Sequence, residues 1–315
     1  MKTTNYVSSL VICMALGMYT SQAQNEPQKD STGLPGDHFS LAGALEMFKK
    51  AGSPEEFEKL LNQEENGVNN LDLNNDSDID YVKVINKKDG DVQLFILQIP
   101  VSASENQDVA VIELEKTGTE TAVLQIIGDE DLYGDETILE PDDAAASETT
   151  FSTLPSRGPS AENGEYNTFH TSAGIIVNVW AWPVVRFVYA PSYGVWVSPW
   201  GWGRRPGWWR PWRPIGWRAF HPMRYRYPNR YVVVHTHRVV RARPLYRPVR
   251  VSSVTVRTRN QVAVRNYRAG RTVQSRTVTT ASGRKVQATR KTTTVQGRNG
   301  RKATRTTTTV RKKRT

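Results

Sequence analysis

The stretch YVKVINKKDGDVQLFILQIPV, residues 81–101, decides the fold. It holds two runs rich in Val, Ile, Leu and Phe, Tyr81–Asn86 and Asp91–Val101, joined by KKDG at residues 87–90. β-Branched and aromatic residues favour extended chain, and an Asp-Gly pair between two such runs indicates a tight turn. The stretch therefore predicts two adjacent antiparallel strands.

Further strands are expected after this hairpin. Asp108–Lys116 and Glu120–Ile127 are β-rich runs on either side of a Thr-Gly-Thr turn at residues 117–119. Thr137–Leu139 is expected to add a short edge strand. Because turn residues separate consecutive β-rich runs, the pattern predicts an antiparallel sheet.

Two short helices are expected before the sheet. Leu41, Leu45 and Phe48 recur at helical spacing. SPEEFEKLL, residues 53–61, begins a second helix, because Ser can cap it, Pro suits its first position and two acids favour the positive end of its dipole. Residues 38–141 are therefore predicted to form an acidic α+β domain, with two short helices packed on a small antiparallel sheet.

The charges of the chain form two blocks. All 31 Asp and Glu residues lie between Glu26 and Glu165, and residues 166–315 carry no acid but 42 − 10 = 32 of the 42 Lys and Arg residues. Residues 24–165 thus carry 9 − 31 = −22, and the rest of the chain carries +32. Such a basic block attracts nucleic acid, anionic lipid or acidic polysaccharide, and it can equally attract the acidic half of the same protein.

The first 23 residues have the pattern of an export signal. Lys2 precedes an apolar run, Val7–Tyr19, and SQA at residues 21–23 is a small-x-small cleavage site. The run is too short to span a membrane, so we expect cleavage after Ala23 and no transmembrane span in the mature chain. The only cysteine, Cys13, lies inside the signal. The mature chain, beginning with a flexible leader over residues 24–37, is expected in the periplasm, at the outer membrane or outside the cell.

An acidic loop, DLNNDSDID at residues 72–80, lies between the helices and the sheet. Oxygen-bearing side chains stand at every second position, as in a loop around a calcium ion: Asp72, Asn74, Asp76, Asp78 and Asp80. An EF-hand loop would have Gly in place of Ser77 and Glu in place of Lys83. Two interpretations stay open, a structural calcium site and a solvated turn whose side chains cap backbone groups.

Gly174–Ala190 is the most apolar stretch of the mature chain. Asn178, Pro183 and Arg186 interrupt it, which disfavours a membrane helix. A small buried β-meander is expected instead, with strands at Ile175–Trp182, Val184–Tyr189 and Val195–Val197.

All nine Trp residues lie between Trp180 and Trp217, and from Trp200 onward they alternate with Arg, Pro and Gly. In composition, residues 196–218 resemble short Trp/Arg/Pro-rich antimicrobial peptides. Trp favours the membrane interface, and Arg pairs with lipid phosphates. The residues expected to bind such a surface are Trp200, Trp202, Arg204, Arg205, Trp208, Trp209, Arg210, Trp212 and Arg213. Stacking on single-stranded bases or sugars, and packing against the protein's own sheet, are the alternatives.

The remaining segments are of low complexity. Residues 142–173 are predicted to be a polar linker, residues 174–249 a Trp/Arg/Pro-rich β-prone region, and residues 250–315 a basic Thr/Arg-rich tail that is largely disordered. The chain has no G-x-S-x-G, phosphate-binding loop or H-E-x-x-H motif, and its five histidines are scattered. The protein is therefore predicted to be no enzyme, with calcium as the only expected cofactor.

Asp37–Pro141 resembles a family of exported proteins from Gram-negative bacteria to which no activity is attached. The resemblance is carried by the first predicted helix, Phe39–Lys50, and by three further segments: SPEEFEKLL at residues 53–61, NNLDLNNDSDIDYVKV at residues 69–84, and IGDEDLYGDETILEP at residues 127–141. It implies a periplasmic or surface location. The leading hypothesis is a non-enzymatic envelope protein that binds lipopolysaccharide or phospholipid. Binding of nucleic acid or another polyanion, and self-association of the two halves, are the alternatives.

Overall fold

The computed structural model describes residues 31–142, 176–224, 226–227, 230–269, 271–279, 285–296 and 302–312, the last three ranges as backbone. The predicted signal peptide and nearly all of the predicted linker lie outside these residues. In the described part of the leader, the carboxylate of Asp37 accepts hydrogen bonds from Thr32 N–H (2.6 Å) and Gly33 N–H (2.9 Å). Leu34 is 2% exposed, and Arg224 donates a hydrogen bond to Asp37 O at 3.1 Å. Residues 31–37 are thus held on the domain, where the sequence predicts flexibility.

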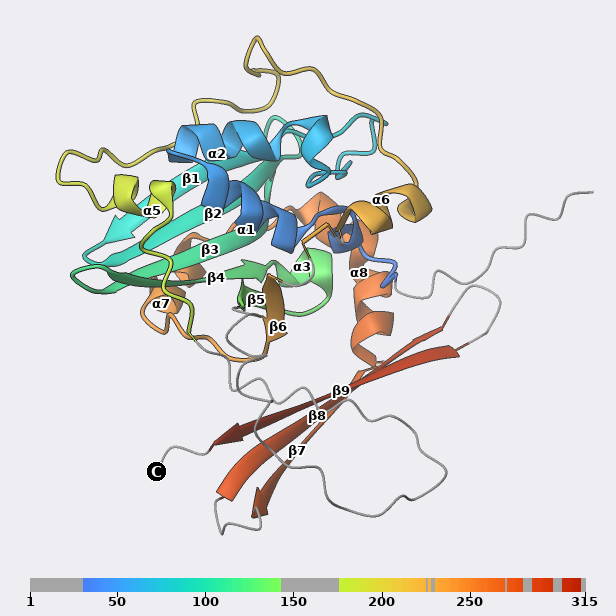
Figure 1. Cartoon of the computed structure of the whole chain (residues 1–315). Helices are drawn as coiled ribbons and strands as arrows, with labels where there is room; N and C mark the ends of the chain where they lie inside the picture. The colour runs from blue at the N-terminus through green and yellow to red at the C-terminus, as the bar shows by residue number, and fades with distance from the viewer. Residues whose placement is uncertain are drawn as a thin grey trace, which may run out of the picture.

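A six-stranded antiparallel sheet forms the centre of the molecule, with its strands in chain order (Figure 1). They are β1 (Lys83–Asp89), β2 (Val92–Pro100), β3 (Asn106–Gly118), β4 (Thr121–Gly128), β5 (Thr137–Pro141) and β6 (Tyr231–Val234). The predicted α+β class and the strands β1 to β5 are confirmed, but β5 is not the expected edge strand, because it pairs with both β4 and β6. Gly90 has φ +56° in the turn between β1 and β2, a conformation that glycine adopts at little cost.

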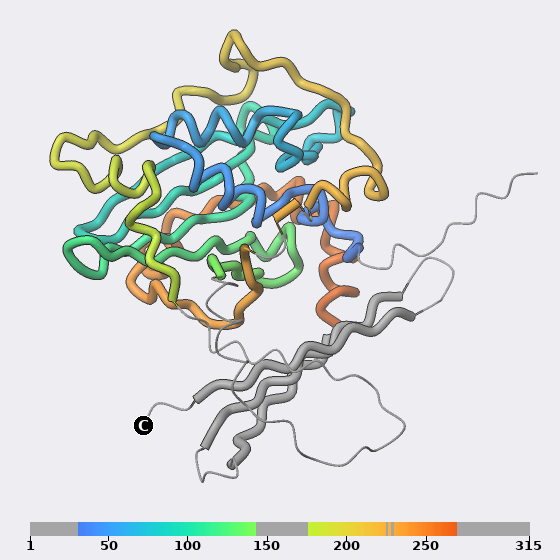
Figure 2. Tube along the Cα trace, viewed as in Figure 1, coloured from blue at the N-terminus to red at the C-terminus, as the bar shows by residue number. Residues whose placement is uncertain are grey.

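The helices α1 (Leu41–Lys50) and α2 (Pro54–Leu61) cross one face of the sheet (Figure 2). Each begins at a serine whose hydroxyl accepts a backbone N–H three residues on, Ser40 from Gly43 and Ser53 from Glu56. Phe48 then packs edge-on against Phe57 and Phe95, with ring centroids 5.1 and 4.9 Å apart. These apolar contacts join both helices to the sheet in one core.

The expected β-meander over residues 175–197 is wrong. Within its described part, Pro183–Val188 form helix α5, while Val197 makes a single bridge to Ile85 of β1. Pro183 suits the first turn of a helix, and Val184, Val185 and Val188 are fully buried in the α1–sheet core. Helical spacing lets one short segment bury these valines together, so packing overrides their preference for strands.

The opposite face of the sheet is covered by the basic half. Helix α7 (Ala242–Tyr246), followed by the 3-10 turn η3 (Arg247–Val249), packs there with Val239 on Leu94 and Val111. Both faces of the sheet are therefore buried, and the basic half supplies one of the two covers. Among the described residues, no helix is both long and apolar enough to cross a membrane.

The prediction of a largely disordered tail is wrong for residues 254–269. They form helix α8 (Val254–Ala269), which packs on the short helix α3 (Glu130–Tyr133). Ser253 accepts a hydrogen bond from Val256 N–H (3.1 Å), and Val256 is 1% exposed. A capping serine and a buried contact therefore stabilise a helix that composition alone disfavours. Beyond it, β7 (Arg271–Thr279), β8 (Lys285–Gln296) and β9 (Lys302–Lys312) pair as a separate antiparallel sheet.

Ion pairs between described residues connect the acidic half to the basic half. The partners lie far apart in the sequence: Arg230 pairs with Glu46 at 2.9 Å, and their positions differ by 184 residues. Arg241 pairs with Glu115 at 3.2 Å, and Arg238 pairs with Glu140. Acidic and basic side chains of the two halves thus pair within one chain. Self-association as a function stays a prediction.

Candidate functional site

The acidic loop, residues 72–80, folds around the carboxylate of Asp72. Its Oδ1 accepts the N–H groups of Asn75 (2.7 Å) and Asp76 (3.2 Å), and its Oδ2 accepts that of Ser77 (3.0 Å). Asn75 and Ser77 have φ of 64° and 71°, a left-handed conformation that short polar residues tolerate. These contacts match the predicted alternative of a turn whose side chains cap backbone groups.

The last acid of the loop is buried. Asp80 is 2% exposed, and its Oδ2 accepts Leu73 N–H at 2.5 Å. Burial raises the pKa of Asp80 to about 7, a rise that the Leu73 hydrogen bond opposes and the charge of Asp72 reinforces. Asp76 and Asp78, by contrast, are exposed.

The acidic loop is also the calcium site that the sequence predicts. No group of three or more His, Cys, Asp or Glu side chains in the described part of the chain is arranged to hold a metal ion. Several carboxylate oxygens of the loop also accept backbone N–H groups. The site formed by Asp72, Asn74, Asp76, Asp78 and Asp80 stays a prediction.

The Trp/Arg loop, which we define as residues 199–213, is fixed at its start by Glu58 of α2. The buried Glu58 carboxylate accepts hydrogen bonds from Ser198 Oγ (2.9 Å) and Trp196 Nε1 (3.3 Å). It also accepts Tyr81 Oη and Val84 N–H, each at 2.8 Å. Burial raises the pKa of Glu58, while these hydrogen bonds oppose the rise. One carboxylate therefore links α2, β1 and the start of the loop.

The end of the Trp/Arg loop is fixed by Asn70. The Asn70 side chain accepts Ile215 N–H and donates to Ile215 O, both at 2.9 Å. Ile79 N–H donates to Trp212 O at 2.8 Å, which joins this loop to the acidic loop. Figure 1 shows the segment as an arch over α2 with both ends returning to the domain. Its conformation is therefore set by the acidic domain.

The structure separates the nine predicted surface-binding residues into two groups. Trp209 is 4% exposed, lies edge-on to Tyr81 with centroids 5.3 Å apart, and has Arg205 over its ring at 4.7 Å. Trp200, Trp212 and Arg205 are half-buried. The exposed group consists of Trp202, Arg204, Trp208, Arg210 and Arg213. One part of the motif thus holds the loop in place, and the other part faces solvent.

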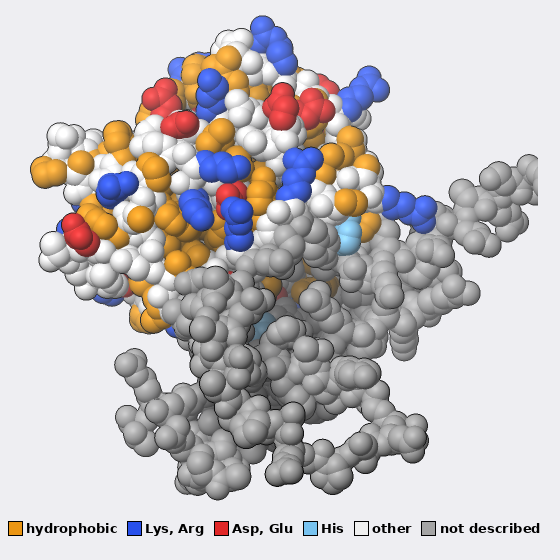
Figure 3. All heavy atoms as spheres, viewed as in Figure 1, with side chains coloured by type: hydrophobic (Ala, Val, Ile, Leu, Met, Phe, Trp, Pro, Cys, Tyr) orange, Lys and Arg blue, Asp and Glu red, His pale blue; other side chains and the backbone are white. Residues whose placement is uncertain are grey.

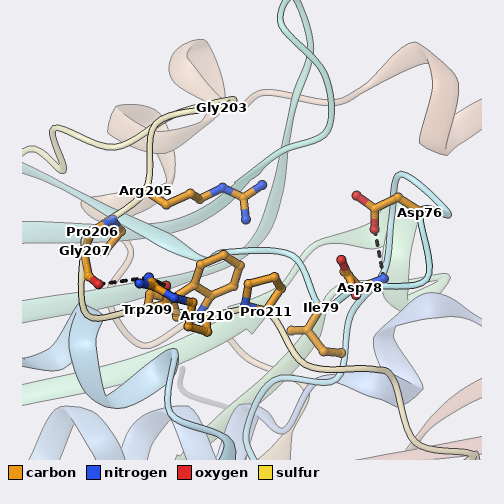
Figure 4. A pocket seen from close by; sticks show the side chains of 10 residues that line it. All are labelled: Asp76, Asp78, Ile79, Gly203, Arg205, Pro206, Gly207, Trp209, Arg210 and Pro211. Carbon is orange, nitrogen blue, oxygen red and sulfur yellow. Dashed lines mark hydrogen bonds between the residues drawn. The ribbon is translucent and has the colours of Figure 1, made fainter.

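The two sites predicted from sequence meet in an open pocket of about 480 Å³ (Figure 4). Asp76 and Asp78 of the acidic loop lie on one side, and Arg205 of the Trp/Arg loop reaches toward them from the other. Trp209, Pro211 and Ile79 lie beneath. Arg210 lines the same pocket, but its guanidinium donates to the carbonyl oxygens of Gly207 and Trp209 at 2.9 Å each.

Sequence reasoning missed the residues that position this site. Glu58 falls between Phe57 and Leu61, on the apolar face of α2, so a charge within a hydrophobic stripe was the available signal. Asn70 and Ser198 had no such signal. Their partners lie 145 and 140 residues away, and only the fold brings them together.

A separate polar cluster lies on the opposite face of the sheet, around Glu113 of β3. Glu113 is 1% exposed, and its Oε2 has no hydrogen-bond partner among the described residues. Burial, reinforced by the charge of Glu136, raises the pKa of Glu113 to about 8 against the effect of Arg243. Glu136 itself accepts hydrogen bonds from Arg243 (3.2 Å) and lies 3.0 Å from His237 Nε2.

Glu113→Gln is expected to stabilise the protein at alkaline pH. The pKa of Glu113 rises from 4.5 to about 8 on folding, so the native protein loses stability as pH increases through this interval. The variant lacks this loss, and its free energy of unfolding should exceed that of the native protein by about 2–4 kcal/mol near pH 9. The two proteins should be equally stable below the unfolded pKa.

Urea unfolding across this pH range measures the difference. Glu115→Gln is the matched control, because Glu115 lies on the same strand but pairs with Arg241 near the surface; it should bring no alkaline gain. A Glu113→Gln effect that is the same at every pH would contradict the prediction.

No family model, curated protein or solved structure matches the chain. The resemblance to exported Gram-negative proteins stays a prediction.

Proposed function

We propose that the protein is an exported, non-enzymatic envelope protein that binds an anionic amphipathic surface, lipopolysaccharide or phospholipid, through the exposed part of the Trp/Arg loop. The observation that carries the proposal is the exposure of Trp202 (44%) and Trp208 (47%) on one arched loop beside Arg204, Arg210 and Arg213. Exposed apolar groups that gather on one surface mark interaction sites, and Trp with Arg is the pair that suits a membrane interface.

Further apolar side chains are exposed in the segments that lead into the loop. Val195 and Val197, just before the loop, are 48% and 59% exposed, and Phe187 of α5 is 45% exposed. Figure 3 shows hydrophobic and basic side chains side by side at the end of the molecule where the loop lies. An interface that buries these groups gains roughly 25 cal/mol per Å² of apolar area removed from water.

The fixed ends of the loop also support the proposal. Because Glu58 and Asn70 hold both ends, the exposed rings are presented without ordering a free chain. A prearranged loop loses less conformational entropy on binding than a flexible tail of the same composition.

The double variant Trp202→Ala/Trp208→Ala is expected to weaken binding to phosphatidylglycerol vesicles by about tenfold or more, since one tenfold step needs only about 1.4 kcal/mol. Sedimentation with vesicles at low and high salt, followed by Trp fluorescence, measures it. We expect a blue shift that survives high salt in the native protein and is lost in the variant.

Val240→Ala is the control, because Val240 is 68% exposed outside the loop; it should bind as the native protein does. Unchanged binding of the double variant would overturn the proposal. Binding that disappears in salt without a blue shift would instead favour a general polyanion binder, with DNA an equal candidate.

A further inference from the structure

We propose that the pocket between the acidic loop and the Trp/Arg loop binds a phosphoethanolamine group, either as the headgroup of a phospholipid or free in solution. The inference deepens the proposed function, because it assigns a chemical class to one component of the surface that the loop contacts. It rests on unpaired groups of opposite charge that face one another across one pocket.

The two sides of the pocket carry opposite charge. Arg205 extends from the Trp/Arg loop toward Asp76 and Asp78 on the acidic loop (Figure 4). Among the described residues, neither the Arg205 guanidinium nor the Asp78 carboxylate has a hydrogen-bond or ion-pair partner. A ligand with one anionic and one cationic group would therefore satisfy both sides at once.

The basic side suits a phosphate. The guanidinium presents parallel N–H donors that match two phosphate oxygens, and stacking over Trp209 at 4.7 Å fixes its plane. Trp209 itself is 4% exposed, lines the pocket, and has an indole N–H without an acceptor in the described part of the chain. The buried Trp209 ring therefore gives the guanidinium a fixed support at this side of the pocket.

The acidic side suits a primary ammonium group. The carboxylate of Asp76 already accepts Asp78 N–H (2.9 Å) and Asn74 Nδ2 (2.8 Å), whereas that of Asp78 is unused. Carboxylates accept the N–H donors of a primary ammonium, and a quaternary choline has none to offer. A headgroup with phosphate alone would meet repulsion from both aspartates.

The position of the pocket fits a headgroup rather than a deeply enclosed ligand. Gly203 and Gly207 line it, and each is adjacent in sequence to an exposed ring, Trp202 or Trp208. Rings that enter a lipid interface would therefore bring the pocket to the level of the headgroups. Its volume of about 480 Å³ accommodates a group of this size.

The experiment measures binding of the full chain to three kinds of vesicle. The first is phosphatidylglycerol alone, and the other two are phosphatidylglycerol mixed with the same fraction of either phosphatidylethanolamine or phosphatidylcholine. We expect phosphatidylethanolamine to tighten binding by about twofold to fivefold relative to phosphatidylcholine, the range of a solvent-exposed ion pair. Asp78→Asn should abolish this difference and keep binding to phosphatidylglycerol. Glu55→Gln, at an exposed acid outside the pocket, is the matched control and should keep the difference.

Titration calorimetry with free phosphoethanolamine separates the two sources. If the free compound binds saturably and Asp78→Asn abolishes that binding, the pocket is supported even when the protein binds no vesicle. That combination would overturn the proposed function but not this inference. A phosphatidylethanolamine effect without binding of the free compound assigns the site to the lipid. The inference is overturned if the protein binds the phosphatidylethanolamine and phosphatidylcholine vesicles equally and does not bind the free compound. It is also overturned if the Asp78→Asn variant behaves as the native protein does.

Discussion

Glu58→Ala is expected to lower the free energy of unfolding by about 3–5 kcal/mol, because it leaves several buried donors without an acceptor at about 1–3 kcal/mol each. These donors are Tyr81 Oη, Val84 N–H and Ser198 Oγ, which all lie within 2.9 Å of the carboxylate. The variant should also release the start of the Trp/Arg loop, since Ser198 and Trp196 lose their common partner.

Urea unfolding measures the loss of stability. Glu55→Ala is the matched control, since Glu55 is an exposed acid in the first turn of the same helix. It should cost less than about 1 kcal/mol, the contribution of an acid near a helix N-terminus. A Glu58→Ala variant as stable as this control would show that the carboxylate does not hold the three segments together.

Arg250→Met is expected to cost about 3–5 kcal/mol, because removing one partner of a buried ion pair leaves an uncompensated charge. Arg250 donates to both oxygens of Asp129 at 2.6 and 2.9 Å and to Asp131 at 2.8 Å. The Asp129 side chain is only 1% exposed, so water cannot replace the guanidinium. The effect should detach the segment that leads into α8.

The cost of Arg250→Met should depend on pH. Burial raises the pKa of Asp129 to about 6 even though Arg250 opposes the rise, so without Arg250 the carboxyl should be protonated at still higher pH. Protonation removes the unpaired charge, and the loss of stability should therefore be smaller near pH 5 than near pH 8.

Unfolding of Arg250→Met at these two pH values tests the prediction. Arg241→Met is the control, because the Arg241 side chain is 60% exposed and its pair with Glu115 should contribute less than about 1 kcal/mol. A pH-independent cost, or a cost no larger than that of the control, would contradict the prediction.

Local patterns were sufficient for the elements whose signals lie within a few residues. The caps at Ser40 and Ser53, the turn at Gly90 and the β-rich runs on either side of it occur where the sequence predicts them. Capping and tight turns depend on contacts three or four residues apart, and a single sequence contains those contacts completely.

The same patterns were misleading where burial decided the conformation. Val184, Val185 and Val188 favour strands by propensity, yet they form one face of α5 because α1 and the sheet bury them together. The Thr/Arg-rich composition after residue 250 predicts disorder, yet Ser253, Val256 and the pair of Arg268 with Glu130 of α3 stabilise α8. In both cases the packing partner lies far away in sequence.

The sequence by itself determined the α+β class, the first five strands, the charge separation of the two halves and the residue types of the acidic and Trp/Arg loops. Only the tertiary structure decided that these two loops meet in one pocket and that Trp209 is buried while Trp202 and Trp208 are exposed. The reason is physical: the Glu58 and Asn70 hydrogen bonds that position the loops join residues about 140 positions apart, and exposure depends on those partners rather than on neighbours in the chain.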